Sequence, residues 1–294
     1  RDTAPNLRAL AAEGVRFAAA YAPTATTGPS HVSLFTALYP MTHRVLKNGH
    51  RLAAEHETLA EILAAEGFDT AAVVSSYVLN RKFGYDQGFA SYDDDVSQAD
   101  TPSASFQWEG ETVEGKFFGR ADDTTRRARD WLTRRPHRER PFFLFVHYFD
   151  PHDPYAPPPG YRPPFELGRE VALKLERTLA LYDIEIAYTD EQIGRLLAGL
   201  GELDLAQDTV VVVLADHGEG LMQHGHMFHG VHIYEEAVRV PLIVRWPGRL
   251  APRVEPQVVP LIGLAPTLME FVGSARGADR FQAQSFAGLL RGDE

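Results

Sequence analysis

Apolar residues recur along the chain at two different spacings. Six segments carry them at helical spacing: 3–15, 31–40, 57–68, 122–135, about 168–200 and 261–273. Five other segments are nearly continuous apolar runs of strand length: 15–22, 69–79, 141–149, 208–216 and 240–248. Because the two kinds of segment alternate, they predict βαβ units. We therefore expect an α/β fold, with a mainly parallel central sheet flanked by helices on both faces.

The run DTVVVVLAD at 208–216 is the clearest strand in the chain. Its lack of alternation is typical of a strand that is buried on both faces. The segment 94–120 has the weakest pattern, and we expect an excursion loop or a small hairpin there. We find no internal repeat, low-complexity tract or interdomain linker in the sequence, which predicts a single domain over residues 1–294.

The composition excludes several classes of protein. Hydrophobic residues make up 44% of the 294 residues, which is enough for a sizeable core. The net charge of −11 argues against nucleic-acid binding, because phosphate contacts need clustered positive charge. The chain has no cysteine, so disulfides and thiolate metal sites are excluded. No apolar run approaches the ~18 residues that a membrane span needs.

In an open α/β sheet, ligands bind at the carboxyl ends of the strands. That rule points to the turns that follow four segments: 16–21, 69–75, 141–149 and 209–215. The last turn begins with Asp216 and His217, a hard carboxylate beside an imidazole that suits Zn, Mn or Fe. The alternative is that Asp216 caps the next helix and His217 binds nothing. The spacing alone leaves both interpretations open.

Histidines are concentrated just after this pair. Five of the 12 histidines lie within 16 residues, at positions 217, 224, 226, 229 and 232. The cluster predicts a pocket wall that handles an anion, a metal or a proton, and the alternative is a surface loop rich in histidine. A second loop, DPHDPY, follows the strand at 141–149 and carries Asp150, His152 and Asp153. Its prolines suit residues that must hold a pose, and a purely structural turn is the alternative.

The stretch TATTGPSHVSLFT at 24–36 places hydroxyl groups at the start of a helix. Pro29 suits the first helical position, with Thr27 or Gly28 as the cap. A helix start exposes unpaired N–H groups and a partial positive charge, so it favours an oxyanion. The Thr27 hydroxyl could attack an electrophile whose charged oxygens bind those same N–H groups. A simple helix cap is the alternative.

Six stretches in order, over nearly the whole chain, resemble the sulfatase branch of the alkaline-phosphatase superfamily. They are APNLRALAAEGVRFAAAYAPTATTGPSHVSLFTALYP, TLAEILAAEGFDTAAVVSS, PFFLFVHYFDPHDPY, ADHGEGL, VRVPLIVRWPG and LAPTLMEFVG. The resemblance implies an alkaline-phosphatase-like sheet and one divalent metal ion. The chain opens at Arg1 without a methionine or a visible signal peptide. By the resemblance it is a catalytic domain truncated at both ends, without the family's first strand, which bears metal-binding aspartate, and without its C-terminal subdomain.

The resemblance also implies a nucleophile. Thr27 stands where the family has the Cys or Ser that becomes formylglycine, and His31 stands where it has an arginine. Threonine is not expected to become formylglycine, but it is the nucleophile in phosphodiesterase and phosphoalcohol-transferase relatives. The lysine and histidine that the family carries on its second strand have no match, because Ser75 and Ser76 stand there.

Further roles follow from the same resemblance. Asp216 matches a metal-binding aspartate, and His217 replaces the asparagine of calcium-dependent sulfatases. Because calcium prefers oxygen ligands, this histidine favours Mn²⁺ or Zn²⁺ over Ca²⁺. His152 matches a substrate-binding histidine, and His229 falls near a residue that contacts the transferred group.

We therefore predict a metal-dependent hydrolase of sulfate or phosphate esters, with in-line attack by Thr27 and phosphoryl chemistry favoured. The predicted site comprises catalytic Thr27, His152 and His229, substrate-binding Ser30, His31 and His224, and metal-binding Asp216, His217 and Thr27. The expected substrate is an anionic ester of a small molecule, a glycan or a lipid headgroup. A true sulfuric ester hydrolase is the first alternative, and a catalytically silent anion-binding domain is the second. The family is often exported, but the compartment and the oligomeric state are left open.

Overall fold

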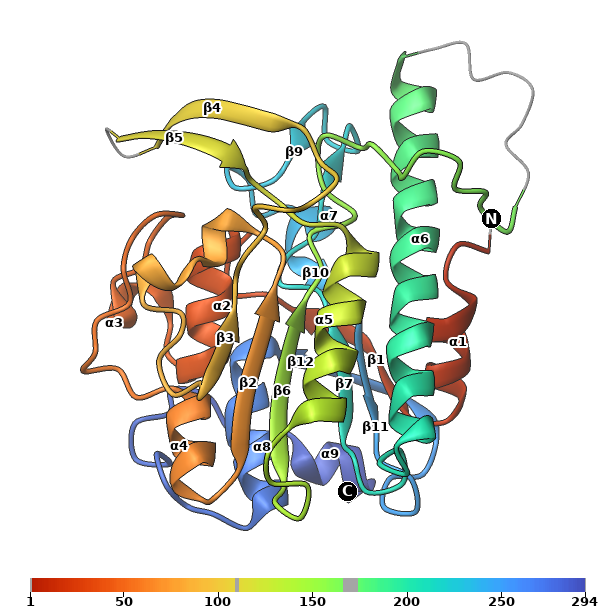
Figure 1. Cartoon of the computed structure of the whole chain (residues 1–294). Helices are drawn as coiled ribbons and strands as arrows, with labels where there is room; N and C mark the ends of the chain where they lie inside the picture. The colour runs from red at the N-terminus through yellow and green to blue at the C-terminus, as the bar shows by residue number, and fades with distance from the viewer. Residues whose placement is uncertain (1, 109–110, 166–173, 294) are drawn as a thin grey trace.

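The computed structural model describes residues 2–108, 111–165 and 174–293 (Figure 1). Two sheets form the middle of the molecule, and helices lie on both sides of them (Figure 1). The α/β fold class predicted from the sequence is therefore confirmed. None of the described helices is long and apolar enough to cross a membrane.

The larger sheet is built around β1 (Val15–Tyr21). Strand β12 (Arg253–Pro260) pairs with β1 in parallel, whereas β10 (Arg239–Val240) and β11 (Leu242–Arg245) pair with it antiparallel. Strand β7 (Val211–Leu214) lies at the edge, antiparallel to β11. The antiparallel β10 and β11 are an addition to the predicted parallel sheet, because apolar spacing carries no information on strand direction.

The smaller sheet contains three parallel strands. Strand β2 (Asp69–Val74) lies between β3 (Ser91–Asp93) and β6 (Phe142–His147). In this register Asp69 lies opposite Phe142, and Val74 lies opposite His147. The carboxyl end of β6 therefore carries a histidine to the edge of the sheet where ligands are expected.

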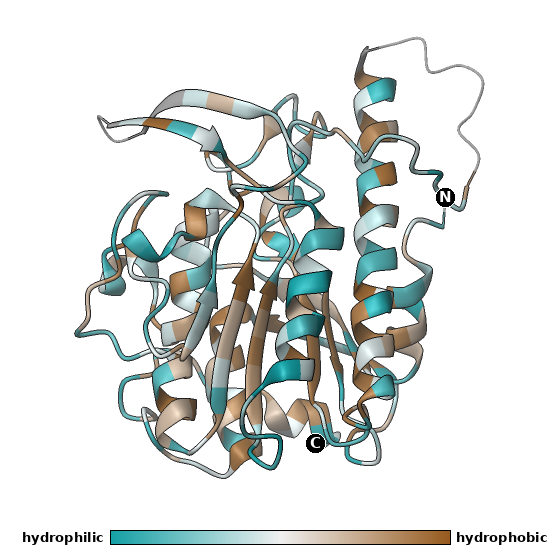
Figure 2. Ribbon diagram, in the orientation of Figure 1, coloured by the Kyte–Doolittle hydropathy of each residue, from teal (hydrophilic) through white to brown (hydrophobic). Residues whose placement is uncertain are grey.

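Long helices cover both faces of the sheets. Helices α5 (Ala121–Arg134) and α6 (Lys174–Glu202) cover one face, and α2 (Thr27–Thr36) and α8 (Leu264–Val272) cover the other (Figure 1). Strands β2 and β6 are strongly hydrophobic, whereas α5 shows mainly polar residues on the side turned outward (Figure 2). The buried residues of α5 recur at helical spacing: Ala121, Thr124, Thr125, Ala128 and Leu132.

The remaining described elements are short. The helices are α1 (Pro5–Ala12), α3 (Pro40–His43), α4 (Leu59–Ala65), α7 (Glu235–Val238) and α9 (Ala287–Arg291), with 3₁₀ turns η1 (Tyr77–Leu79), η2 (Arg81–Phe83) and η3 (Leu261–Gly263). Strands β4 (Ser103–Trp108) and β5 (Glu111–Lys116) form an antiparallel hairpin, which confirms the hairpin expected within 94–120. Part of the helix predicted from about residue 168, namely 168–173, lies outside the described residues.

Among the described residues, strands β6 and β7 each pair on one side only, and a cavity of about 1640 Å³ lies between their free edges. Side chains of α6, such as Leu196, close one side of the cavity, and side chains of α8, such as Leu264, close the other. All four residues of β7 are half-buried. The prediction that the strand at 208–216 is buried on both faces is therefore wrong, because β7 borders this cavity.

Candidate active site

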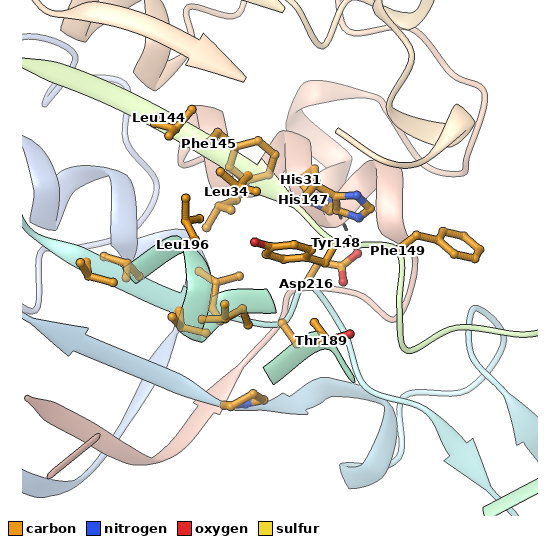
Figure 3. A pocket seen from close by; sticks show the side chains of 18 of the residues that line it. His31, Leu34, Leu144, Phe145, His147, Tyr148, Phe149, Thr189, Leu196 and Asp216 are labelled. Atoms are coloured by element: carbon orange, nitrogen blue, oxygen red, sulfur yellow. Dashed lines mark ion pairs between the residues drawn. The ribbon is translucent and has the colours of Figure 1, made fainter. Parts of the chain in front are cut away.

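The polar groups of the site meet at the carboxyl ends of three strands. Thr27 begins the helix that follows β1, His147 ends β6, and Asp216 and His217 follow β7. Figure 3 shows His31, His147 and Asp216 close together at one part of the cavity, while Leu144 and Phe145 line an apolar part. The residues predicted from the ends of the strands therefore lie together at one edge of the sheet.

Helix α2 begins two residues earlier than expected. Its cap is Thr26, which has an extended backbone and makes no side-chain capping bond, and Thr27 is the first helical residue. The expectation that Thr27 or Gly28 is the cap, with Pro29 in the first helical position, is therefore wrong. The Thr27 hydroxyl instead lies 3.1 Å from Nε2 of His217. This frees the hydroxyl for chemistry, because the helix start does not use it.

The hydrogen bonds of His217 define which ring nitrogen faces Thr27. Nδ1 lies 2.8 Å from the carbonyl oxygen of Gly218, and a carbonyl only accepts hydrogen bonds, so Nδ1–H is the donor. Nε2 of a neutral ring is then an acceptor, and the Thr27 hydroxyl donates to it. A side chain at position 218 would place its Cβ 2.0 Å from the carbonyl oxygen of Glu236, so only glycine permits this turn.

Asp216 carries a buried oxygen that has no hydrogen-bond partner among the described residues. Its Oδ2 lies 3.4 Å from Nε2 of His217 and 3.5 Å from Nδ1 of His31. Burial raises the pKa of Asp216, but the neighbouring His217, His31 and His147 outweigh that effect and lower the pKa to about 2. Asp216 is therefore a carboxylate whose Oδ2 and the Thr27 hydroxyl both lie within 3.4 Å of Nε2 of His217.

The backbone N–H groups of α2 are mostly occupied. The N–H of Gly28 donates to Oδ1 of Asn48 at 2.7 Å, Pro29 has no N–H, and the N–H of Ser30 donates to the carbonyl of Thr26 at 3.0 Å. The predicted anion cradle of several N–H groups at this helix start is therefore wrong. At most the N–H of Thr27 remains, so side chains must supply most of the contacts to an anion.

Three imidazole rings form a row beside Thr27. The ring centroids of His217 and His229 are 4.1 Å apart, and those of His229 and His152 are 5.0 Å apart. Nδ1–H of His229 donates to Glu219 at 3.1 Å, and Nδ1–H of His152 donates to the carbonyl of Asp153 at 2.6 Å. As in His217, the Nδ1 atoms are held by fixed acceptors, which leaves the Nε2 atoms for proton transfer or binding.

The three residues predicted to bind substrate lie in different places. His31 is buried beside Asp216, and its Nδ1–H donates to the carbonyl of Thr27 at 2.8 Å. The Ser30 hydroxyl donates to the carbonyl of Asp216 at 2.6 Å, which ties α2 to the turn after β7. His224 instead pairs with Glu236 at 2.7 Å, on the exposed part of the loop. Within the described chain, the structure brings Ser30 and His31 to Asp216 but shows no contact between His224 and that residue.

Two further residues, which the sequence did not predict, line the same cavity. His147 is half-buried, its Nδ1 has no described partner, and its ring lies 5.3 Å from that of His31. Its place at the end of a predicted strand could have identified it. Asn48 accepts the bond from Gly28 through Oδ1, which leaves its amide hydrogens as donors beside Thr27. Asn48 lies in a loop with no readable pattern, so no signal in the sequence marks it.

The predicted metal ligands converge, but they do not enclose a cation by themselves. Thr27 Oγ1, His217 Nε2 and Asp216 Oδ2 lie around one point, and the Asp216 oxygen lacks a described partner. Within the described ranges, no group of three or more His, Cys, Asp or Glu residues is arranged to hold a metal. The residues present therefore fit a cation as a partial ligand set, with an imidazole that suits Mn²⁺ or Zn²⁺.

Comparison with known proteins finds, over most of the chain, the family that the sequence motifs resemble. The family model described as Sulfatase matches residues 1–274. The chain is 29% identical over 263 residues to an ulvan-active sulfatase of Formosa agariphila, covering 83% of this chain and 51% of that one. It is 28% identical over 319 residues to arylsulfatase A of Bos taurus, covering 93% of this chain and 60% of that one. The chain therefore spans about half of the first relative and less than two thirds of the second.

Solved structures share the fold. The structure of BT4656 in complex with its substrate D-glucosamine-2-N,6-O-disulfate superposes with a TM-score of 0.79 at 22% identity, covering 99% of this chain and 75% of that one. The phosphonate monoester hydrolase of Silicibacter pomeroyi superposes with a TM-score of 0.77 at 24% identity, covering 100% of this chain and 73% of that one. At these identities the likeness concerns the fold alone.

Proposed function

The chain belongs to the sulfatase family, and from that premise we propose that it is the catalytic part of an ester hydrolase with Thr27 as the nucleophile. Its substrates are sulfate or phosphate esters. The observation that carries the proposal is the 3.1 Å contact between the Thr27 hydroxyl and Nε2 of His217. A hydroxyl paired with a base of defined tautomer is the arrangement that activates a weak nucleophile.

The side chains support a two-step reaction. Thr27 Oγ forms a bond to the sulfur or phosphorus while the bond to the leaving oxygen breaks, and the Thr27 proton passes to Nε2 of His217. The leaving oxygen takes a proton from the His229 and His152 pair, and Glu219 stabilises the charged form of His229 through the 3.1 Å bond to Nδ1. Water then attacks the sulfur or phosphorus and gives one proton back to the His229 and His152 pair, while the bond to Thr27 Oγ breaks and Thr27 takes back the proton held by His217.

A divalent cation held by Asp216, His217 and Thr27 would lower the pKa of the Thr27 hydroxyl and neutralise an oxygen of the ester. With the cation bound, Nε2 of His217 would be its ligand and not the base, and the Thr27 proton would pass to solvent. Asp216 Oδ2 supports this role because it is buried, charged and without a described partner. We expect chelation to abolish turnover in the full-length protein, and Mn²⁺ or Zn²⁺ to restore it better than Ca²⁺. Full activity in the presence of a chelator would mean that the reaction needs no metal ion.

The partial ligand set indicates where the remaining ligand lies. The cavity between β6 and β7 has the position of a strand, and its two free strand edges end at His147 and Asp216. We propose that an extended segment of the full-length protein fills this place and ends in a carboxylate beside Asp216. That carboxylate would complete the cation site from the third side.

The substrate class follows from the nucleophile and from the relatives. Thr27 favours direct attack on phosphorus, because a threonine does not supply the aldehyde hydrate of formylglycine sulfatases. A sulfate ester is the second candidate, because the family model and the ulvan-active and glucosamine-disulfate relatives concern sulfated substrates. We propose an anionic ester on a glycan in either case, bound at the open side of Thr27.

Paired substrates test the two candidates. The full-length protein should hydrolyse bis-nitrophenyl phosphate faster than nitrophenyl sulfate, and the reverse order would establish the sulfate ester as the substrate. Equal turnover by wild type and Thr27→Ala would contradict the nucleophile. A folded wild type that binds anionic glycans without any turnover would support the silent binding domain instead.

A further inference from the structure

Glu185 of α6 places a carboxyl group in the protein interior. It is 1% exposed, and it forms no ion pair with any described residue. A buried carboxylate without a cation is costly unless its oxygens accept hydrogen bonds. The residue lies outside the row of imidazoles, so the proposed reaction does not use it directly.

Both oxygens of Glu185 bind the loop that carries His152. Oε2 accepts the backbone N–H of His152 at 3.3 Å, and Oε1 accepts the backbone N–H of Ala156 at 2.6 Å. The two bonds hold the two ends of the segment 152–156. Helix α6 therefore holds this loop at two points.

The segment between these two bonds contacts residues of the candidate active site. The His152 ring packs on Phe149 with centroids 4.3 Å apart and meets the His229 ring at 5.0 Å. The Tyr155 hydroxyl donates to Glu219 at 3.0 Å, and Glu219 accepts the bond from Nδ1 of His229. The position of the segment therefore determines how His152 and Tyr155 meet His229.

Further hydrogen bonds hold the same loop. Asp150, which precedes the segment, accepts the backbone N–H of Ala121 at 2.9 Å at the start of α5. The Arg120 guanidinium donates to the carbonyl of Ala156 at 2.7 Å and to that of Asp100 at 2.8 Å. Burial, followed by the nearby Asp150, raises the pKa of Glu185 to about 8. The segment is thus held through backbone groups by α5 and α6 together.

We propose that Glu185 is a positioning residue for the His152 imidazole, holding the segment 152–156 so that the ring stays in contact with His229. The proposal rests on the proposed function, in which these two rings protonate the leaving oxygen. Glu185 does not touch the substrate in this role. Its loss moves His152 while Thr27, His217 and Asp216 keep their places.

Glu185→Gln tests the proposal, because the amide keeps the volume but replaces one accepting oxygen by a donor. Glu191→Gln is the matched control, since Glu191 lies on the same helix and pairs with the exposed Arg195 and with Tyr161, not with the segment 152–156 as far as the structure describes it. In the full-length protein we expect kcat for an ester with a poor leaving group to fall about ten-fold in Glu185→Gln, with KM little changed. For a nitrophenyl ester, which needs no proton at the leaving oxygen, we expect little change.

A double-mutant cycle separates positioning from general damage. Glu185→Gln should lower kcat in the wild type but have no further effect in a His152→Ala background, because the positioned group is then absent. Equal losses in both backgrounds would overturn the proposal. The NMR signals of the His152 ring supply a readout that does not depend on turnover. They should shift in Glu185→Gln and not in Glu191→Gln, and unchanged signals would also overturn it, even if Thr27 proves not to be the nucleophile.

Discussion

At the scale of single residues, the most informative group is the Thr27 hydroxyl. It stands where a helix cap was an equally simple explanation, yet it makes no capping bond and faces His217. Thr27→Ala should therefore remove the reaction without removing the helix. We expect kcat to fall by about three orders of magnitude or more, while the melting temperature changes by roughly 2 °C or less.

Thr27→Ser is the matched control for this prediction. Serine keeps the oxygen and loses a methyl group, so a measurable fraction of the wild-type rate should remain. Steady-state rates and thermal melts of the three proteins check the prediction together. A large loss of melting temperature in Thr27→Ala would show instead that the side chain is structural.

The half-buried ring of His147 gives a prediction about acid stability. Burial, followed by the nearby His31, lowers the pKa of His147 from 6.5 to about 3. A pKa below the unfolded value means that folding favours the neutral ring. Its contribution to the free energy of unfolding is therefore present above about pH 6.5 and is lost as the pH falls toward 3.

His147→Gln should weaken this pH dependence, since glutamine does not titrate. Urea unfolding of wild type and variant at pH 7, 5.5 and 4.5 measures it. The difference in unfolding free energy between the two proteins should shift in favour of the variant as the pH falls, by up to about 1.4 kcal/mol per pH unit. A difference that is constant with pH would mean that His147 is not buried as a neutral ring in the folded protein.

At the scale of elements, one hydrogen bond joins the nucleophile helix to the turn that carries Asp216. The Ser30 hydroxyl, which is buried, donates to the backbone carbonyl of Asp216 at 2.6 Å. Ser30→Ala leaves that carbonyl without its donor, and we expect the free energy of unfolding to fall by about 1–2 kcal/mol. Thr133→Ala is the control, because its exposed hydroxyl bonds only to Arg129 within the same helix. Denaturant unfolding should show a smaller loss of unfolding free energy for Thr133→Ala than for Ser30→Ala. Equal losses would mean that the bond from Ser30 to Asp216 stabilises the fold no more than a hydrogen bond within one helix.

The sequence predicted the elements of the site better than their exact starts. The rule that ligands bind at strand ends brought Asp216, His217 and the loop of His152 to one edge, because parallel strands end together. The predicted start of α2 lies two residues after the observed one. Pro29 also fits the third helical position, because its missing N–H costs no bond within the helix there. Local preference therefore does not decide between neighbouring starts.

Contacts between distant segments explain what the sequence could not predict. His224 belongs to the same histidine cluster as His229, yet the short pairing of β8 (Gly220–Leu221) with β9 (Met227–Phe228) separates them. Glycine at 225 and 230, both with positive φ, turns the chain between these points. Spacing along the sequence contains no information on such a path. The same holds for Glu185, which reads as one more polar position on a long helix.

At the scale of the whole molecule, the cavity between β6 and β7 is the dominant feature. It is bordered by the half-buried Phe145 and Val212 and measures about 1640 Å³. Apolar surface of this extent beside two free strand edges favours binding of hydrophobic molecules and association between chains. The chain of residues 1–294 alone should therefore increase the fluorescence of the dye ANS, and the full-length protein should do so much less. Equal fluorescence of the two would mean that the cavity stays open in the full-length protein.

The pairing of β1 has a consequence for synthesis of the chain. Val15 lies beside Arg253, and the other neighbours of β1 also come from β10 and β11, near residue 240. A ribosome releases the first strand long before any of its partners exists. Until residue 239 has emerged, β1 has no hydrogen-bonded neighbour from the described sheet, and its pairing with β12 is complete only at residue 260. Nascent chains arrested before that point should depend on chaperones, and release should be followed by slow closure of the sheet around β1.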